Sequence, residues 1–171
     1  MKNTNILVTG GAGYIGSHIV ELLVKAKANV IIYDNLVTGF KELINKKAKF
    51  INGDIKNLKK LSKVIQNNNI TSIIHLAAYL NVSESEKNKK KYYKNNVIGT
   101  SNLIDACKNS QVTNIILSSS VILSKLLLNV MLLPINATSS KPLSVLIENS
   151  PPGTSSLFKR YSIIWLPCCM Y

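Results

Sequence analysis

The chain has 171 residues and a formal net charge of +13 at pH 7, with 46% hydrophobic and 17% charged residues. This length and apolar content fit one compact domain, or one domain with an appendage, and exclude a disordered chain. The basic residues are 20 lysines and a single arginine, whereas base and phosphate recognition favours arginine, so we expect no nucleic-acid partner.

Short β-branched runs alternate with amphipathic stretches through the first 120 residues. The runs predict strands at Asn5–Thr9, Val30–Tyr33, Lys49–Asn52, Ser72–His75 and Asn114–Leu117. Apolar residues at helical spacing predict helices over Tyr14–Lys27, Leu58–Gln66 and Lys89–Cys107. Strands separated by helices pair in parallel through right-handed crossovers. We therefore expect an α/β fold with a doubly wound parallel sheet of about five strands.

A glycine-rich turn follows the first predicted strand and opens the first predicted helix. Its glycines are Gly10, Gly13 and Gly16. The first allows a tight turn, the second lets backbone N–H groups approach a pyrophosphate, and the third lets the helix pack close to the strand. The free N–H groups and the positive end of the helix dipole then face the phosphates. This context indicates a dinucleotide site in a Rossmann-like domain.

A carboxylate ends the second predicted strand. Asp34 lies 18 residues after Gly16, where it can accept hydrogen bonds from the ribose hydroxyl pair and repel a 2′-phosphate. We therefore expect NAD rather than NADP as the cofactor. Taken alone, Asp34 and Asn35 would form an ordinary strand-ending turn, but the glycines and the spacing together favour the dinucleotide site.

The composition changes sharply after Ser120. All five prolines, the only tryptophan and the only arginine lie beyond it, whereas seven of the eight acidic residues and seven of the eight glycines lie before it. We therefore expect residues 1–120 to form the NAD-binding domain. Residues 121–171 would be an atypical tail, either poorly ordered or produced by a change of reading frame, with no complete substrate domain.

The cysteines and the apolar runs exclude further classes. Three cysteines, two of them adjacent, indicate neither a disulfide framework nor a metal site. The residues after Met1 lack the apolar core of a signal peptide, and the longest apolar run, residues 121–133, is too short to span a bilayer. We therefore expect a cytoplasmic protein with no bound metal and no membrane contact.

Successive motifs over about residues 3–120 resemble those of UDP-glucose 4-epimerases, which are extended short-chain dehydrogenases/reductases. The motifs are TGGAGYIG, YDNL, GDI, HLAA, ES, NNVIGT and SSS, beginning at Thr9, Tyr33, Gly53, His75, Glu84, Asn95 and Ser118. The resemblance implies tightly bound NAD, a UDP-hexose substrate and a homodimer in the full-length family. It also implies interconversion of UDP-glucose and UDP-galactose through transient oxidation at C4.

The resemblance further implies roles for individual residues. The cofactor-binding candidates are the three glycines with Tyr14 and Ile15 at the pyrophosphate, Asp34, Asn35 and Gly39 at the adenosine ribose, Asp54 and Ile55 at the adenine, Leu76, Ala77 and Ala78 toward the nicotinamide ribose, and Asn96. Without the resemblance, Asp54 would be a turn residue, and Asn96 would only cap or brace its helix.

The catalytic residues that the resemblance implies are incomplete. Ser120 matches the hydroxyl that contacts the reacting oxygen, with Ser118 and Ser119 as register alternatives. The family also uses a tyrosine with a lysine four residues later, a spacing that places both on one helix face and lets the ammonium lower the pKa of the phenol. None of the seven tyrosines has a lysine at that spacing. We therefore expect an inactive, truncated relative that resembles the N-terminal part of the family only.

Three alternatives stay open. Another nucleotide-sugar epimerase or a dehydratase of the same superfamily would share these motifs. A non-catalytic NAD-binding protein would account for the missing tyrosine–lysine pair. A basic nucleic-acid module is the third alternative, which the scarcity of arginine disfavours.

Overall fold

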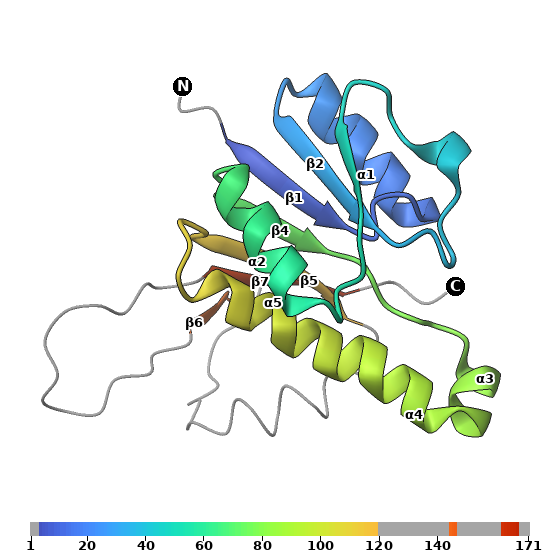
Figure 1. Ribbon diagram of the computed structural model, residues 1–171. Coiled ribbons are helices and arrows are strands. Elements are labelled where there is room, and N and C mark those ends of the chain that lie inside the picture. The colour runs from blue at the N-terminus through green and yellow to red at the C-terminus, as the bar shows by residue number, and fades with distance from the viewer. Residues whose placement is uncertain (1–3, 120–143, 147–161, 168–171) are drawn as a thin grey trace, which may run out of the picture.

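The computed structural model describes residues 4–119, 144–146 and 162–167. Its strands form one sheet in the order β3-β2-β1-β4-β5-β7-β6 (Figure 1). They are β1 Asn5–Thr9, β2 Asn29–Asp34, β3 Lys49–Asn52, β4 Ser72–His75, β5 Asn114–Ser119, β6 Ser144–Leu146 and β7 Ser162–Pro167. The first five strands pair in parallel, which confirms the predicted doubly wound, Rossmann-like fold.

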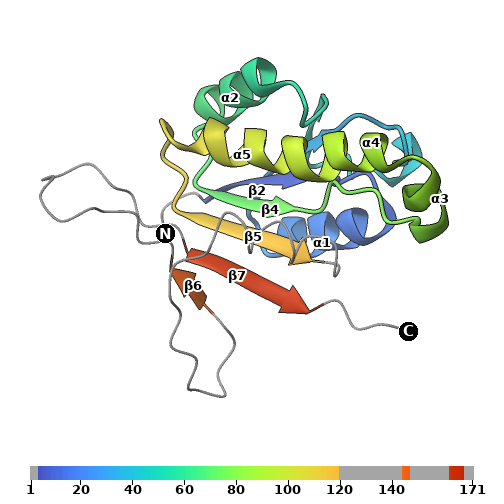
Figure 2. The same cartoon turned by 90° about the horizontal axis from the view of Figure 1, so that it is seen from below.

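Helices cover both faces of the sheet. They are α1 Tyr14–Lys25, α2 Leu58–Asn67, α3 Val82–Lys87, α4 Lys89–Tyr92 and α5 Gly99–Cys107, with a 3-10 turn η1 (Lys41–Leu43) and a π-helical segment η2 (Tyr93–Ile98). Figure 2 shows α2 and α5 on one face and α1 on the other. From β1 the chain builds β2 and β3 on one side, then crosses to β4 and β5 on the other, so the strand order reverses between β1 and β4.

Two helices differ from their predicted form. Helix α1 ends before Lys27, because that residue adopts a left-handed φ of 60° and the N–H of Ala28 turns back to Leu23 O at 3.0 Å. The predicted helix over Lys89–Cys107 consists of α4, η2 and α5 in succession. Its middle turn is π-helical where the hydroxyl of Thr100 donates to Asn96 O at 2.7 Å, a side-chain bond that competes with regular helix geometry.

One helix and two strands were not predicted. Helix α3 begins after Asn81, whose side-chain oxygen accepts a hydrogen bond from Glu84 N at 2.9 Å. Strand β7 pairs in parallel with the outer edge of β5, and β6 pairs antiparallel with β7. The sheet therefore extends by two strands beyond the five predicted ones. Ser120 and, apart from β6 and β7, residues 121–171 lie outside the described residues, so the division into a domain and a tail stays a prediction.

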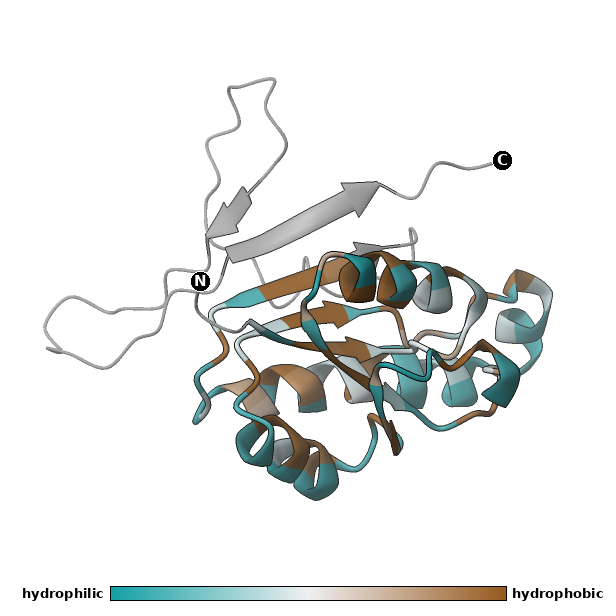
Figure 3. Cartoon of the chain, turned by 90° about the horizontal axis from the view of Figure 1, so that it is seen from above, coloured by the Kyte–Doolittle hydropathy of each residue, from teal (hydrophilic) through white to brown (hydrophobic). Residues whose placement is uncertain are grey.

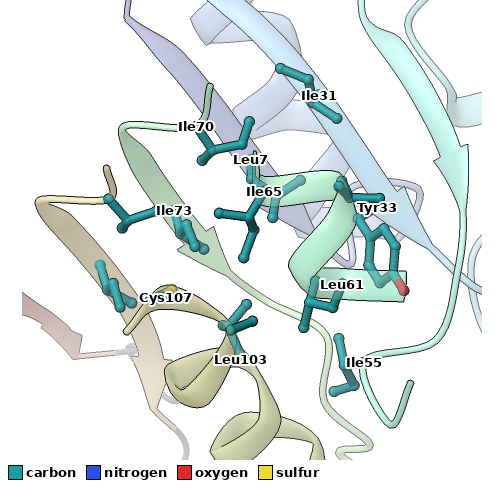
Figure 4. Close-up of a cluster of buried hydrophobic side chains, with 14 of the residues drawn as sticks. Leu7, Ile31, Tyr33, Ile55, Leu61, Ile65, Ile70, Ile73, Leu103 and Cys107 are labelled. Atoms are coloured by element: carbon teal, nitrogen blue, oxygen red, sulfur yellow. The ribbon is translucent and has the colours of Figure 1, made fainter. Parts of the chain in front are cut away.

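Apolar side chains fill the space on both faces of the sheet. The larger cluster lies under α2 and α5 and includes Leu7, Leu61 and Leu103 (Figure 4). The smaller one includes Val8 and Val20 under α1. Adjacent residues of β1 thus enter opposite clusters, as the two-residue period of a strand buried on both faces requires. Figure 3 shows apolar strands at the centre and polar stretches on the outer helices.

The strand ends that carry the expected site lie level with one another. Thr9, the last residue of β1, pairs with Tyr33 of β2 on one side and with His75 of β4 on the other. The turns that follow these three strands therefore meet at one edge of the sheet, at the point where the strand order reverses. Open α/β sheets bind their ligands at this position.

Candidate functional site

A cavity of about 400 Å³ opens at this edge of the sheet. The predicted site residues that line it are Gly10, Gly13, Tyr14, Ile15, Gly16, Asp34, Asn35, Ile55, Leu76, Ala77 and Ala78. The lining also contains Tyr33, Thr38, Gly53, Tyr79, Leu80 and Asn95, to which the sequence analysis gave no role. The volume is that of a typical small-molecule or cofactor site.

The glycine turn is built by close backbone contacts. Gly10 has a left-handed φ of 74°, and a Cβ on it would lie 2.7 Å from Ala77 N. A Cβ on Gly16 would lie only 2.1 Å from Gly10 O. Because these contacts involve backbone atoms, neither position accepts a side chain unless the turn moves. Packing within the protein therefore requires Gly10 and Gly16.

Gly13 differs from its neighbours, because the protein itself leaves room there. A Cβ on Gly13 would meet only Gly10 O, at 3.3 Å, and the residue lines the cavity. Gly13 is also the N-cap of α1, and none of the described side chains caps this helix end. The first N–H groups of a helix have no partner within the helix, and with the dipole they attract anions. The turn therefore fits a phosphate group.

Asp34 connects the turns after β1 and β2. It is 7% exposed, and its Oδ2 accepts a hydrogen bond from Ala12 N at 3.0 Å. Its Oδ1 accepts another from Leu36 N at 2.8 Å. Since each carboxylate oxygen can accept more than one hydrogen bond, Asp34 can still receive hydroxyl donors in the cavity. Gly39 does not line the cavity but lies against this carboxylate, because a Cβ on it would be 3.0 Å from Asp34 Oδ1.

Asp54 lies behind the cavity wall rather than in it. Its Oδ2 accepts a hydrogen bond from Asn35 Nδ2 at 3.2 Å and forms an ion pair with Lys56 Nζ at 3.2 Å. Desolvation would raise the pKa of Asp54, but the hydrogen bonds from Lys56 and Asn35 and the lysine charge together hold it below the ordinary value. Asp54 thus orients Asn35, which does line the cavity.

Tyr33 forms the wall next to Gly53. Its hydroxyl donates to Asp54 O at 3.0 Å, and burial together with the Asp54 charge raises the pKa of Tyr33 to about 12. A Cβ on Gly53 would come within 2.3 Å of the Tyr33 ring. The ring can therefore occupy this position only because residue 53 has no side chain. The sequence offered one signal for this contact, a glycine directly before Asp54.

Asn95 and Asn96 are both buried but have different places. Asn96 accepts from Tyr79 N through Oδ1 and donates to Tyr79 O through Nδ2, both at 2.9 Å. It therefore holds the chain that carries Tyr79 and does not itself line the cavity. Asn95 donates to Asn96 Oδ1 at 3.0 Å and does line the cavity. No sequence signal separates the two adjacent asparagines.

A second group of contacts holds Tyr79 from the other side. The ammonium of Lys91 lies 4.9 Å from the centroid of the Tyr79 ring and pairs with Glu84 at 2.5 Å. The other Glu84 oxygen accepts from the Tyr92 hydroxyl at 3.0 Å. The hydrogen bond from Lys91 lowers the pKa of Glu84. Helices α3 and α4 are thereby tied together beside the cavity residue Tyr79.

His75 is the centre of a buried polar chain beside the glycine turn. Its Nδ1 lies 2.6 Å from Thr9 Oγ1 and its Nε2 lies 3.0 Å from Thr100 Oγ1. All three residues are nearly or fully buried. Desolvation lowers the pKa of His75 from 6.5 to about 4, so the imidazole is neutral at pH 7.

The buried His75 predicts acid sensitivity. Because its pKa is lower in the folded chain, the unfolded chain takes up the proton first, and stability is lost as the pH falls from about 6.5 to about 4. The lowering corresponds to about 3 kcal/mol of the free energy of unfolding. Urea unfolding between pH 7 and 4 measures this loss. His75→Gln should abolish most of it, whereas His18→Gln at the exposed surface should not. An unchanged slope in H75Q would contradict this assignment.

The expectations about metal binding, membrane contact and the catalytic serine can be compared with the described residues only. Among the described side chains, no group of three or more His, Cys, Asp and Glu residues is placed to hold a metal ion. None of the helices in the described ranges combines the length and apolar content that a bilayer crossing needs. The catalytic candidate Ser120 lies outside the described residues.

Comparison with known proteins gives the family. A sequence model of the NAD dependent epimerase/dehydratase family matches residues 6–126. The chain belongs to this family. NAD is the family's cofactor, and the resemblance to UDP-glucose 4-epimerases is confirmed by relatives within the family. The UDP-glucose 4-epimerase of Lactobacillus helveticus is 44% identical over 115 residues, which cover 67% of this chain and 35% of that protein.

Solved structures of the family agree with this. The UDP-glucose 4-epimerase from Brucella ovis in complex with NAD is 41% identical with a TM-score of 0.66, over 69% of this chain and 36% of that one. The UDP-glucose 4-epimerase from Thermotoga maritima with UDP-glucose is 35% identical with a TM-score of 0.67, over 68% of this chain and 38% of that one. The chain thus spans little more than a third of the length of the epimerases it matches.

Proposed function

We propose that this chain binds NAD in the cavity at the carboxyl ends of β1, β2 and β4. The observation that carries the proposal is the contrast within the glycine turn. Gly10 and Gly16 are required by the protein's own packing, whereas Gly13 leaves an open space in front of the α1 N-terminus. A diphosphate fits that space both sterically and electrostatically. The NAD complex of the Brucella ovis relative supports this reading.

The lining suggests which residues hold each part of the cofactor. The N–H groups of Tyr14 and Ile15 would donate to the pyrophosphate. Asp34 would accept from the hydroxyls of the adenosine ribose, and its charge would repel the 2′-phosphate of NADP. Ile55 and Tyr33 would border the adenine. The segment 76–78, with Asn95, would line the nicotinamide end.

Three predicted site residues would act indirectly, by holding residues that line the cavity. Gly39 lies against the Asp34 carboxylate, Asp54 holds Asn35, and Asn96 holds the backbone of Tyr79. We therefore assign these three a positioning role. When bound, NAD would supply the hydride acceptor for oxidation of a sugar hydroxyl.

The chain would be the cofactor-binding part of an epimerase that acts on UDP-hexoses. The UDP-glucose 4-epimerase relatives support this substrate class. Within these 171 residues no tyrosine is followed four residues later by lysine, so the pair that would remove the hydroxyl proton is missing. We therefore infer that the isolated chain does not convert UDP-hexoses. The missing pair equally favours a second candidate function, a non-catalytic NAD-binding protein.

Calorimetric titration of the purified chain tests the proposal. We expect it to bind NAD at least about tenfold more tightly than NADP, because Asp34 repels the additional phosphate. Mixed with UDP-galactose and NAD, the chain should form no UDP-glucose, while a full-length UDP-glucose 4-epimerase serves as the positive control. A folded chain with no affinity for NAD would overturn the binding proposal. Conversion of UDP-galactose would overturn the inference that the isolated chain is inactive.

A further inference from the structure

The hydrogen bonds that join Thr9, His75 and Thr100 form a chain with a defined donor-to-acceptor direction. The Thr100 hydroxyl donates its only proton to Asn96 O, at 2.7 Å. Toward His75 Nε2 it can then only accept, so Nε2 carries the ring proton. A neutral imidazole protonated at Nε2 has a bare Nδ1, which accepts from the Thr9 hydroxyl at 2.6 Å. The bonds thus run in one direction from Thr9 through His75 and Thr100 to the backbone of Asn96.

This chain of bonds connects three walls of the cavity. Thr9 directly precedes the turn glycine Gly10, and His75 directly precedes the lining segment 76–78. At the far end, Asn96 belongs to the π-helical segment η2, which also carries the lining residue Asn95. The glycine turn, the segment after β4 and the η2 turn are therefore joined through one imidazole.

The chemistry of these residues is unusual for a position that only fills the core. Thr9, His75 and Thr100 are at most 3% exposed, and apolar residues of similar volume would fill the space without hydrogen bonds. A fully satisfied buried network instead selects a single arrangement of the segments that it joins. The η2 turn needs such a constraint, because π-helical turns are rare and occur mostly at functional sites.

The chain of bonds lies on one side of the glycine turn only. It spans β1, β4 and α5, whereas Asp34 ends β2 and Asn35 follows it, on the opposite side of β1. None of the bonds from Thr9 to Asn96 involves the residues proposed to hold the adenosine, although Asp34 contacts the glycine turn through Ala12 N. The segments proposed to hold the pyrophosphate and the nicotinamide end are joined by these bonds.

We propose that His75 is a positioning residue. Through its hydrogen bonds with Thr9 and Thr100 it sets the distance between the glycine turn and the η2 turn that carries Asn95. These two turns would hold the pyrophosphate and the nicotinamide half of NAD. The proposal rests on the proposed NAD binding. It distinguishes two parts of the cofactor, since removal of either threonine hydroxyl should weaken the binding of NAD and leave the binding of adenosine, which has no phosphate, almost unchanged.

Calorimetry with NAD and with adenosine on the full chain tests this. We expect Thr9→Val and Thr100→Val each to weaken NAD binding roughly tenfold, as the loss of a buried hydrogen bond implies, and to change adenosine binding less than about threefold. Thr9→Ser and Thr100→Ser keep the hydroxyl and should bind NAD like the unmodified chain. Thr71→Val is the control, because the Thr71 hydroxyl also donates a hydrogen bond, to Asn5 O at 3.3 Å, but at the opposite end of β1.

The outcomes of these titrations distinguish a positioning role of His75 from a general loss of structure and from a failure of the proposed function. Equal weakening of NAD and adenosine binding would indicate a general loss of structure and would overturn the positioning role. NAD affinities in T9V and T100V that match T71V would overturn it too, while leaving the proposed function intact. If the unmodified chain binds adenosine but not NAD, or binds neither, the proposed function fails first and the positioning role with it.

The proton position on His75 gives a second, ligand-free test. Two-bond proton–nitrogen correlation spectra of the unliganded chain at pH 7 should show the Nε2–H form of His75. In T100V the acceptor for this proton is lost, so the Nε2 signal should shift, whereas in T71V it should not. A ring protonated at Nδ1 would overturn the hydrogen-bond direction and therefore the proposal.

Discussion

Gly16→Ala should abolish NAD binding by displacing the glycine turn, and Gly13→Ala should abolish it without displacing the turn. A Cβ on Gly16 would lie 2.1 Å from the backbone oxygen of Gly10, so we expect G16A to lower the free energy of unfolding by about 3 kcal/mol or more. A Cβ on Gly13 meets only one atom, at 3.3 Å, and otherwise enters the cavity. We expect G13A to unfold within about 1 kcal/mol of the unmodified chain.

Urea unfolding and NAD titration of both variants measure this contrast. Gly99→Ala is a useful third variant, because its Cβ would lie 2.5 Å from the Ile55 side chain rather than from backbone. The expected order of stability loss is therefore G16A, then G99A, then G13A. If G13A binds NAD with unchanged affinity, the space in front of α1 is not a phosphate site. If G16A is as stable as the unmodified chain, the close packing of the turn is wrong.

Asp34→Ala should weaken NAD binding roughly 10- to 100-fold and should also loosen the glycine turn. The first effect follows from the loss of charged hydrogen bonds to the ribose. The second follows because Ala12 N, which is fully buried, loses its acceptor Asp34 Oδ2, at a cost of about 1–3 kcal/mol of stability. Asp34→Asn removes the charge and keeps the shape, so it should reduce the preference for NAD over NADP.

Titrations with NAD and NADP, paired with urea unfolding, separate the two effects. Asp105→Ala serves as the control, because Asp105 lies on α5 and forms an ion pair with the exposed Lys108. It should change neither affinity nor cofactor preference. If D34N keeps the same ratio of NAD to NADP affinity as the unmodified chain, Asp34 does not face the adenosine ribose. The proposed orientation of the cofactor would then be wrong.

Local sequence signals were sufficient for strands β1 to β5, for the positions of α1 and α2 and for the glycine turn, but not for α3, β6 or β7. Hydrophobic periodicity depends on neighbouring residues only, so the strands β1 to β5 lie where their β-branched runs predicted them. The glycine turn is a local signal in the same way, because a Cβ on Gly16 would meet Gly10 O, although Gly10 itself lies against Ala77 after β4. The parallel pairing of the strands followed from the alternation of strands and helices.

The tertiary structure alone decided which side chains face the cavity. Asn95 and Asn96 are adjacent and chemically identical, yet only the π-helical turn places the first in the lining and the second on Tyr79. The contacts of Tyr33 with the Gly53–Asp54 turn and of His75 with Thr100 join residues about 20 and 25 positions apart. The pairing of β7 with β5 joins residues farther apart still. Such contacts depend on how separate elements pack, and no short sequence pattern contains that information.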